Sequence, residues 1–366
     1  MNNNAILLPE WARQSAIQLT WPHTGTDWRD YLNDICATYI EMADAITRYE
    51  KLLVVAPEPQ SVEKELRKKL TDCQMSNIVF HKCPTNDTWA RDHGFITLED
   101  NGTYSLLDFC FNGWGNKFEA GLDNAINRSL YTNGITAGNY VAHNDFVLEG
   151  GSIESDGSGT VLTTSQCLLA PHRNQPLTRN EIEEKLKIML HAKRILWIDY
   201  GHLEGDDTDG HIDTLVRIAP GNTLLYVGCD DKNDSHYDDL KLMEEQLKTL
   251  LTTDGKPYRL LRLPMPEPIY DDGDRLPATY ANYVIVNGAV IYPTYNQPDN
   301  DAEAERVIKA AFPDRDIIGI DSRTVIRQHG SLHCCTMQLY CDTKASSTSL
   351  VSSTDLLKRS PPCTIR

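Results

Sequence analysis

Apolar side chains recur along this chain first at helical and then at strand spacing. Residues 28–50 carry them three and four positions apart, which is the period of one helix face. The continuous apolar run at 51–55 then predicts a buried strand. The same helix-then-strand order returns at 179–198, 238–263 and 301–320. A chain that alternates in this way is expected to adopt an α/β fold.

Shorter segments complete the predicted elements. Turn-forming residues separate further apolar runs, and Asn287-Gly288 is a dipeptide preferred in two-residue hairpin turns. The additional elements expected from these patterns are helices at 61–71 and 118–130, strands at 77–80, 104–110, 160–164 and 223–228, and a hairpin over 283–293.

A polar residue stands out after each of these blocks. Intervals of 57, 62, 71 and 52 residues separate five landmarks, which are Asp92, Glu149, His211, Asn282 and Cys334. Similar spacing after similar blocks indicates five related α/β units around a common centre, with one loop of each unit at a shared mouth. The blocks show no visible sequence identity, so an ordinary α/β sheet with chance spacing is the alternative.

The charge composition limits the kinds of molecule that the protein is expected to bind. The chain has 366 residues, enough to bury a large core, and its net charge is −17, from 35 basic and 52 acidic residues. That balance argues against binding to nucleic acid or to an anionic membrane surface, both of which need a basic footprint. It suits a cationic substrate, because an acidic field concentrates cations near a cleft. Simple solubility is the other explanation of the charge.

The cysteines indicate the cellular location of the protein, and the composition of the chain ends indicates the limits of its domain. None of the ten cysteines forms a C-x-x-C pair, and their scatter predicts reduced thiols of a cytoplasmic protein. Met1-Asn2-Asn3-Asn4 begins no signal peptide, and no transmembrane segment is expected. Residues 1–341 are predicted to form a single domain. Residues 342–366, rich in Ser and Thr, are predicted to be a flexible tail.

Cys334 is the first candidate for chemistry. A thiol attacks an electrophilic carbon as the thiolate, and Gly330 and Ser331 just before Cys334 allow a tight turn that could expose its sulfur. A single cysteine is more commonly a core residue. Because Cys335 is adjacent, the residues alone leave open which of the two sulfurs would react.

His211 and Asp213 form a second candidate pair. At positions i and i+2 of an extended segment their side chains share one face. The preceding loop 205–210 is strongly acidic, which raises the alternatives of a metal site or a solvated turn. The EF-hand pattern fails, and H-x-D falls short of the ligands that zinc needs, so no metal is predicted.

Two further acids complete the set. Asp92 follows Arg91, and the two could form a structural salt bridge; Glu149 ends an apolar run before Gly150 and could face a cleft or start a turn. A pair of carboxylates can grip a guanidinium through its fork of N–H donors. Together with a thiol and an imidazole, these acids suggest an enzyme that cuts a C–N bond of a guanidino compound.

Five motifs, in order, resemble the agmatine deiminase branch of the guanidine-modifying, or pentein, superfamily, a branch often labelled peptidyl-arginine deiminase-like. The resemblance covers about residues 5–340, and only the last motif departs, with Gly-Ser-Leu-His-Cys in place of the commoner Gly-Asn-Ile-His-Cys. The motifs are Thr88-Trp89-Ala90-Arg91-Asp92, Leu148-Glu149-Gly150-Gly151-Ser152-Ile153-Glu154, Gly205-Asp206-Asp207-Thr208-Asp209-Gly210-His211-Ile212-Asp213, Ala278-Thr279-Tyr280-Ala281-Asn282 and Gly330-Ser331-Leu332-His333-Cys334.

The resemblance implies a fold and a set of roles. The fold is a five-bladed, pseudo-symmetric α/β propeller. Cys334 rather than Cys335 is the implied nucleophile, because it directly follows the family's Gly-x-x-His. The other implied roles are general acid and base for His211, guanidinium ligands for Asp92 and Asp213, a further active-site acid for Glu149, and substrate-pocket residues for Trp89 and Asn282.

The resemblance also implies an activity. A cytoplasmic agmatine deiminase would convert agmatine and water to N-carbamoylputrescine and ammonia through a covalent cysteine thiouronium, in putrescine and polyamine synthesis from arginine. No cofactor or metal is implied, and the protein could assemble as a homo-oligomer. The alternatives are a deiminase of free or peptidyl arginine, an amidinotransferase of the same superfamily, and a non-catalytic acidic protein that binds polyamines.

Overall fold

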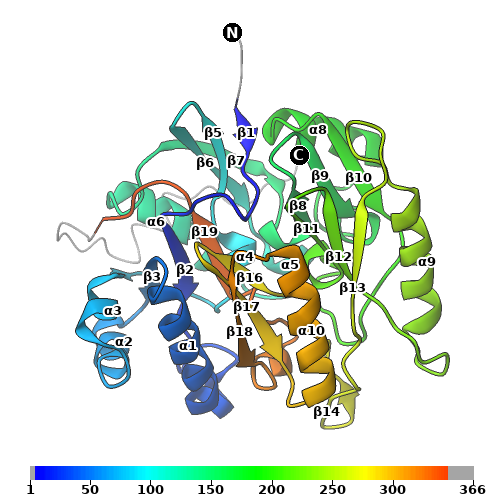
Figure 1. The fold of residues 1–366 in the computed structure, drawn as a ribbon. Helices are drawn as coiled ribbons and strands as arrows, with labels where there is room; N and C mark the ends of the chain where they lie inside the picture. Colours follow the sequence, from blue (N-terminus) through cyan, green and yellow to red (C-terminus); the bar gives the residue numbers. More distant parts are fainter. Residues whose placement is uncertain (1–4, 345–366) are drawn as a thin grey trace.

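The computed structural model describes residues 5–344, and within them it confirms a mixed α/β fold. Helix α9 (Tyr237–Thr249) lies along one side of the ribbon and α2 (Pro59–Leu66) and α3 (Asp72–Ser76) along the other, with strands between them (Figure 1). None of the helices in residues 5–344 is long and apolar enough to cross a membrane.

Five sheets of three or four strands repeat one pattern across the described chain. In each, a central strand pairs in parallel with the strand that follows it through a helix, and antiparallel with a strand on its other side. The strand orders are β19-β2-β3-β4 (Thr336–Leu339, Ala16–Thr20, Lys51–Ala56, Ile78–Lys82), β1-β5-β6-β7 (Ile6–Leu7, Ile96–Asp100, Thr103–Cys110, Asn139–Val147), β8-β9-β10 (Ile153–Ser155, Thr160–Thr164, Arg194–Ile198), β11-β12-β13 (Val216–Ala219, Thr223–Val227, Arg259–Leu263) and β16-β17-β18 (Val284–Val286, Ala289–Thr294, Asp316–Asp321).

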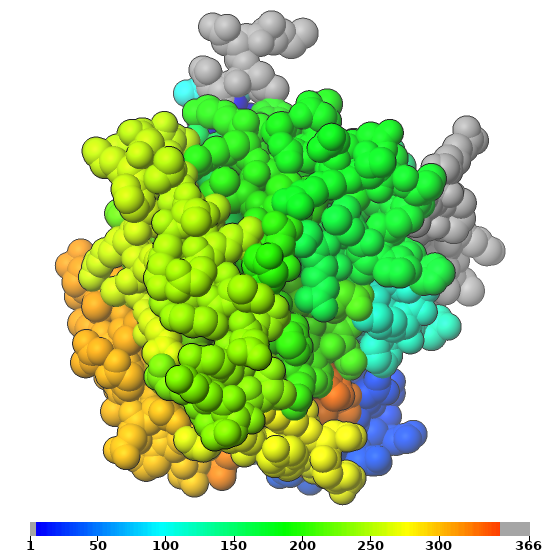
Figure 2. Space-filling view, turned by 90° about the vertical axis from the view of Figure 1, so that its right-hand side faces the viewer, coloured from blue at the N-terminus to red at the C-terminus, as the bar shows by residue number. Residues whose placement is uncertain are grey.

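In each of the five sheets a helix crosses over between the central strand and its parallel neighbour, which gives five related β-α-β units; the first sheet adds a further parallel pair, β3–β4, connected through α2 and α3. The first unit is completed by the last strand, β19, which pairs with β2 near the beginning of the chain. On the side shown in Figure 2, segments of the third and fourth units, coloured green to yellow, cover one continuous face. The crossover helices of the five units in chain order are α1 (Leu32–Thr47), α6 (Ile126–Thr132), α8 (Arg179–Met189), α9 and α10 (Pro298–Ala311).

The first crossover helix shows why the predicted pattern folds this way. Ile35, Tyr39, Met42 and Ile46 stand at helical spacing and are all fully buried against the first sheet. A 3-10 turn, Arg29–Tyr31, precedes α1 where the helix was predicted to begin. The residue periodicity therefore located the helix, and packing of this apolar face stabilises it.

The predicted helix at 118–130 is shorter than expected, because only Asp123–Ala125 (3-10) and α6 are helical there. The Asp123 carboxylate accepts the backbone N–H groups of Asn86 and Asp87, at 2.7 and 3.0 Å. In return, the Asn86 side chain accepts the N–H of Leu122 at 2.7 Å. These bonds hold the segment before Asp123 as a loop, which local periodicity cannot reveal.

The C-terminal limit of the domain and the oxidation state of one cysteine differ from the predictions made from the sequence. Thr343 pairs with Thr136 and the Lys344 N–H bonds to Ile135, so backbone pairing passes the predicted boundary at 341. The rest of the predicted tail, 345–366, lies outside the described residues. The prediction that every thiol is reduced is wrong for Cys110, which is disulfide-bonded. Spacing along the chain cannot show which sulfurs meet.

Candidate active site

The five polar landmarks lie in the five segments that join one β-α-β unit to the next. Backbone and side-chain contacts bring these segments together: the Arg91 N–H bonds to the Cys334 carbonyl at 3.1 Å, and the Gly151 N–H bonds to Asp92 Oδ1 at 3.2 Å. Their positions are α4 (Ala90–His93) for Asp92, the β7–β8 connection for Glu149, the β10–β11 connection for His211 and Asp213, the segment before β16 for Asn282, and the β18–β19 connection for Cys334.

Asp92, His211 and Asp213 converge around Gly151, and all three side chains are buried. His211 Nδ1 lies 3.6 Å from Asp92 Oδ1. A Cβ atom at Gly151 would lie 2.6 Å from His211 Nδ1, 2.9 Å from Asp92 Oδ1 and 3.2 Å from Asp213 Oδ2. Glycine is therefore required here, because any side chain would occupy the space in which the three groups meet.

The electrostatics of this group favour a proton on His211. Burial raises the pKa of the Asp92 carboxyl to about 6, with His211 opposing the rise and Asp213 and Glu149 adding to it. Burial alone would lower the pKa of His211, but the charges of Asp92, Cys167 and Glu149 raise it to about 10. The resting site thus holds an imidazolium between carboxylates.

Cys334 faces the pocket and Cys335 does not. Cys334 lines the cavity, whereas Cys335 packs into the hydrophobic core, in contact with Tyr39. The Cys334 sulfur lies 3.7 Å from Asp213 Oδ2. Burial, followed by the charges of Asp213 and Asp92, raises the pKa of the Cys334 thiol well above its ordinary value. The sulfur next to the acids is therefore a protonated thiol until a cation arrives.

Asn282 lies behind the thiol and is absent from the residues that line the pocket. Its amide Nδ2 donates to the Cys334 sulfur at 3.2 Å. Its Oδ1 accepts the backbone N–H groups of His333 and Cys334 at 3.0 and 3.3 Å. The side chain predicted to bind substrate thus holds the loop that carries the sulfur, through both its Nδ2 and its Oδ1.

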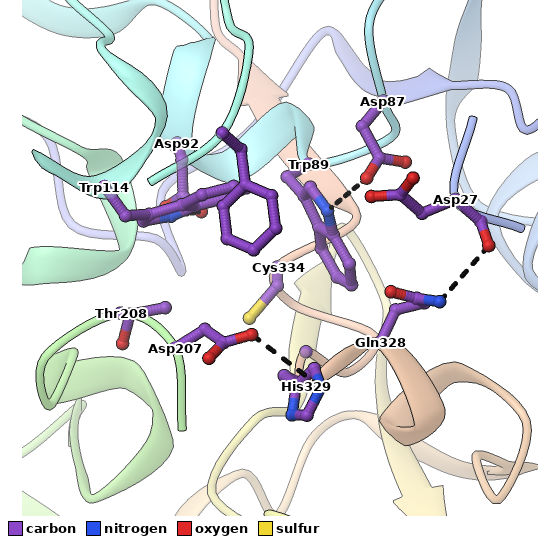
Figure 3. Close-up of a pocket in the computed structure, with 12 residues that line it drawn as sticks. Asp27, Asp87, Trp89, Asp92, Trp114, Asp207, Thr208, Gln328, His329 and Cys334 are labelled. Carbon is purple, nitrogen blue, oxygen red and sulfur yellow. Dashed lines mark hydrogen bonds and ion pairs between the residues drawn. The ribbon is translucent and has the colours of Figure 1, made fainter. Parts of the chain in front are cut away.

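The pocket combines aromatic walls with an acidic rim (Figure 3). Burial raises the pKa of Asp87 to about 7, and burial also raises that of Asp207. Neither arginine nor lysine is among the described residues lining it, which are Asp27, Asp87, Trp89, Asp92, Trp114, Phe118, Asp207, Thr208, Gln328, His329, Gly330 and Cys334.

Trp114 and Trp89 shape the inner wall. The Trp114 indole N–H donates to Asp92 Oδ2 at 3.0 Å, and the Trp89 indole N–H donates to Asp87 Oδ2 at 3.0 Å. A Cβ at Gly330 would lie 2.1 Å from the Trp89 ring, so the glycine before the cysteine also makes room for this aromatic wall. Sequence reasoning found Trp89 but missed Trp114, whose only local signal is its place between Gly113 and Gly115.

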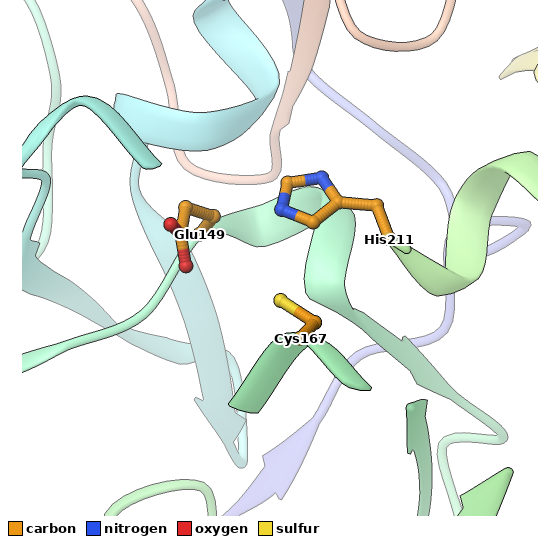
Figure 4. A group of neighbouring side chains, drawn as sticks. All are labelled: Glu149, Cys167 and His211. Carbon is orange, nitrogen blue, oxygen red and sulfur yellow. The ribbon is translucent and has the colours of Figure 1, made fainter. Parts of the chain in front are cut away.

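Glu149 lies at the other side of His211, beside Cys167 (Figure 4). Its Oε1 accepts from Arg173 Nε at 2.9 Å, and both side chains are fully buried. Its Oε2 has no hydrogen-bond partner among the described residues, and neither ring nitrogen of His211 has one. An unpaired carboxylate oxygen close to an imidazole can hold or orient that ring when a ligand enters.

Two clusters offer the donor types that bind metals. Glu10, Glu154 and His333 form one, but Arg91 and Arg217 already bind its carboxylates, so cationic side chains fill the place of an ion. Glu149, Cys167 and His211 form the other. It supplies three donors, one fewer than a closed tetrahedral zinc site, and Arg173 already supplies a positive charge to it.

Comparisons with known proteins agree on one family. A family model described as Porphyromonas-type peptidyl-arginine deiminase matches residues 6–339. The agmatine deiminase of Pseudomonas aeruginosa is 32% identical over 362 residues, covering 92% of this chain and 95% of the relative.

Two solved structures are more similar in sequence. A cysteine-to-serine variant of the agmatine deiminase of C. jejuni with substrate bound is 40% identical, with a TM-score of 0.85, over 93% of this chain and 97% of that one. A Porphyromonas gingivalis structure named "Putative Arginine Deiminase" is 49% identical, with a TM-score of 0.87, over 92% of this chain and 98% of that one.

Proposed function

Because this chain belongs to the family of Porphyromonas-type peptidyl-arginine deiminases, we propose that it hydrolyses agmatine to N-carbamoylputrescine and ammonia. One observation carries the proposal: a single pocket joins the Cys334 thiol and the Asp92 carboxylate to a wall of aromatic and acidic side chains without arginine or lysine. Agmatine carries a guanidinium at one end and an ammonium at the other. The relatives named agmatine deiminases support the choice of substrate.

Asp92 and Asp213 form the proposed guanidinium clamp. They approach the same space from two different units, and Asp213 Oδ1 is buried without a hydrogen-bond partner in residues 5–344. Two carboxylates can receive the forked N–H donors of a planar guanidinium and fix its plane. The carbon of the group would then face the Cys334 sulfur, which lies 3.7 Å from Asp213 Oδ2.

Substrate binding itself would activate the nucleophile. The negative charges that hold the Cys334 proton are those of Asp213 and Asp92, after burial. A bound guanidinium offsets both charges and so favours loss of the thiol proton to the solvent, which leaves the thiolate. The sulfur then attacks the guanidinium carbon, and a tetrahedral adduct forms.

His211 has the proton for the next step. It lies in the resting site as an imidazolium, and it can protonate the departing amine as the C–N bond breaks, which releases ammonia and leaves a covalent S-alkylthiouronium. Water then attacks the same carbon and gives its proton to His211. The C–S bond of this second adduct then breaks, its hydroxyl proton passes to the Cys334 sulfur, and the ureido product leaves with the thiol restored. Glu149 is the proposed partner of the His211 ring.

The proposal also includes the overall fold. The five units would surround one axis as a five-bladed propeller, an arrangement supported by the convergence of their five connecting segments and by the β19–β2 pairing.

A cytoplasmic location is supported by the eight free thiols of the described chain. The product would serve putrescine and polyamine formation. Assembly into a homo-oligomer stays a prediction.

The test is product analysis with three separate substrates: agmatine, free arginine and a peptide with C-terminal arginine. Ammonia and ureide formed from agmatine in equal amounts would support the proposal. An amidinotransferase would instead pass the amidino group to an added amine without releasing ammonia. A binding protein would retain agmatine unchanged.

Agmatine is expected to exceed arginine in kcat/KM by about a hundredfold or more, roughly 3 kcal/mol, the cost of a buried unpaired charge. Free arginine has a carboxylate beside its ammonium. The described side chains available to that carboxylate in the pocket include acids such as Asp87 and Asp207 but no lysine or arginine. Steady-state kinetics with both substrates measure this ratio of kcat/KM values. Added salt should weaken the binding of agmatine, because it screens the attraction between the acidic pocket and the dication. Equal turnover would favour the arginine deiminase activity named for the P. gingivalis structure.

Chelators are expected to leave agmatine turnover unchanged. The thiol mechanism uses no metal, and in the cluster Glu149, Cys167 and His211 the carboxylate is already paired with the Arg173 guanidinium. Activity is compared before and after dialysis against EDTA and again after adding Zn²⁺ or Mn²⁺. A loss that a divalent ion restores would contradict the thiol mechanism.

A further inference from the structure

A line of buried charged groups runs from the active site to the N-terminal segment of the chain. Asp213 Oδ2 meets His333 Nδ1 at 2.7 Å, and His333 Nε2 meets Glu10 Oε1 at 2.7 Å. Glu10 lies between β1 and β2, so 323 residues separate it from His333. We propose that Glu10 and His333 are positioning residues that hold the Asp213 carboxylate in place for the guanidinium of the substrate.

The His333 ring is held at both nitrogens. Each nitrogen lies at hydrogen-bond distance from a carboxylate oxygen. Arg217 Nη2 also lies 3.0 Å from His333 Nε2. These contacts, one at Nδ1 and two at Nε2, fix the position of the ring.

Glu10 is in turn anchored by two guanidinium groups. Arg91 Nη1 donates to its Oε1 at 2.9 Å, and Arg217 Nη2 donates to its Oε2 at 2.6 Å. Arg217 continues to Glu154 through its Nε, at 2.5 Å. Three carboxylates are thus linked by two guanidinium groups and one imidazole, and this connected set of contacts gives each side chain a fixed place.

The last residue of this network, Asp213, is engaged at one oxygen only, and this links the network to the substrate. The network engages only one oxygen of Asp213, Oδ2; Oδ1 is buried with no partner in the described part of the chain. Burial would raise the pKa of this carboxyl, but the hydrogen bond and charge of His333 lower it below its ordinary range. A buried oxygen left unsatisfied costs free energy unless a ligand completes it. The network therefore presents a fixed, ionised acceptor beside Cys334.

The inference rests on the proposed function, because it assigns Asp213 a guanidinium. The decisive variant is Glu10→Gln, which keeps the shape of the side chain and removes its charge. Glu154→Gln is the control: Glu154 also pairs with Arg217, but none of its hydrogen bonds in the described residues goes to His333. Both variants remove one carboxylate partner of Arg217 and should lower Tm similarly.

Glu10→Gln should lower kcat/KM for agmatine by about ten- to a hundredfold, as seen when hydrogen-bond partners of functional residues are removed. Both a rise in KM and a fall in kcat are expected, because Asp213 would bind the guanidinium in the ground state and bind it still more strongly in the transition state. The logarithm of the fall in kcat/KM should be less than about a third as large in Glu154→Gln as in Glu10→Gln. Glu10→Asp should recover part of the lost kcat/KM. Equal losses in Glu10→Gln and Glu154→Gln would reduce Glu10 to a structural role and overturn the proposal.

A second measurement separates this proposal from the substrate assignment. Binding of methylguanidinium, which carries only the head group, is measured by calorimetry in a Cys334→Ser background, where the ligand cannot form a covalent adduct. Glu10→Gln should raise its dissociation constant about tenfold, whereas Glu154→Gln should leave it near the value of the Cys334→Ser protein. That pattern without agmatine turnover by the protein with Cys334 intact would reject the proposed function and keep the positioning role. A dissociation constant unchanged by Glu10→Gln would reject the positioning role, whatever the turnover.

Discussion

Replacing Cys334 with serine is expected to abolish agmatine turnover while leaving the fold intact. The hydroxyl is a far weaker nucleophile than a thiolate, and removal of a catalytic nucleophile typically costs roughly ten-thousandfold or more in kcat. The change in volume is small, and Asn282 can still donate to the new oxygen from its position beside the sulfur. Ureide formation and thermal unfolding of the variant are the measurements.

Cys335→Ser provides the matched control, since it makes the same chemical change one residue along. Cys335 packs in the core against Tyr39 and is absent from the residues that line the pocket, so its sulfur cannot reach a substrate bound there. This variant should keep most of the activity, with a lower Tm from the buried hydroxyl. An inactive Cys335→Ser protein beside an active Cys334→Ser protein would reverse the assignment.

Gly151→Ala is expected to lower kcat/KM by about a hundredfold or more, although the residue has no side chain to contribute. Its new methyl group would lie 2.6 Å from His211 Nδ1 and 2.9 Å from Asp92 Oδ1, closer than atoms pack. One or both groups must move, and a displacement of about 1 Å at a reacting site can cost 10²-fold. Kinetics with agmatine measure the loss.

The control for this substitution is Gly121→Ala, where a Cβ would have no atom within 4 Å. It should leave both activity and Tm near wild-type values, since an exposed alanine is tolerated in open space. If Gly151→Ala turned over agmatine normally, the convergence of His211, Asp92 and Asp213 around this glycine would not be the catalytic geometry.

Local patterns were sufficient for most of the fold. Buried positions at helical spacing predicted α1, and the dipeptide Asn287-Gly288 predicted the turn between β16 and β17, because both signals arise from neighbours along the chain. The five polar landmarks were found from their spacing, and the structure places each of them in a connection between units. The motifs that carried the family resemblance named Cys334, Asp92 and Trp89, which line the pocket.

Tertiary structure alone decided how these residues act on one another. Nothing in the order of Cys334 and Cys335 shows which sulfur meets a cavity, and nothing near Asn282 shows that its amide is already engaged. Trp114 and Glu10 had no chemical signal in the sequence, since each acquires its role from a partner in another unit. A contact between residues 323 positions apart depends on the packing of all five units, whereas a helix or turn depends on its own few residues.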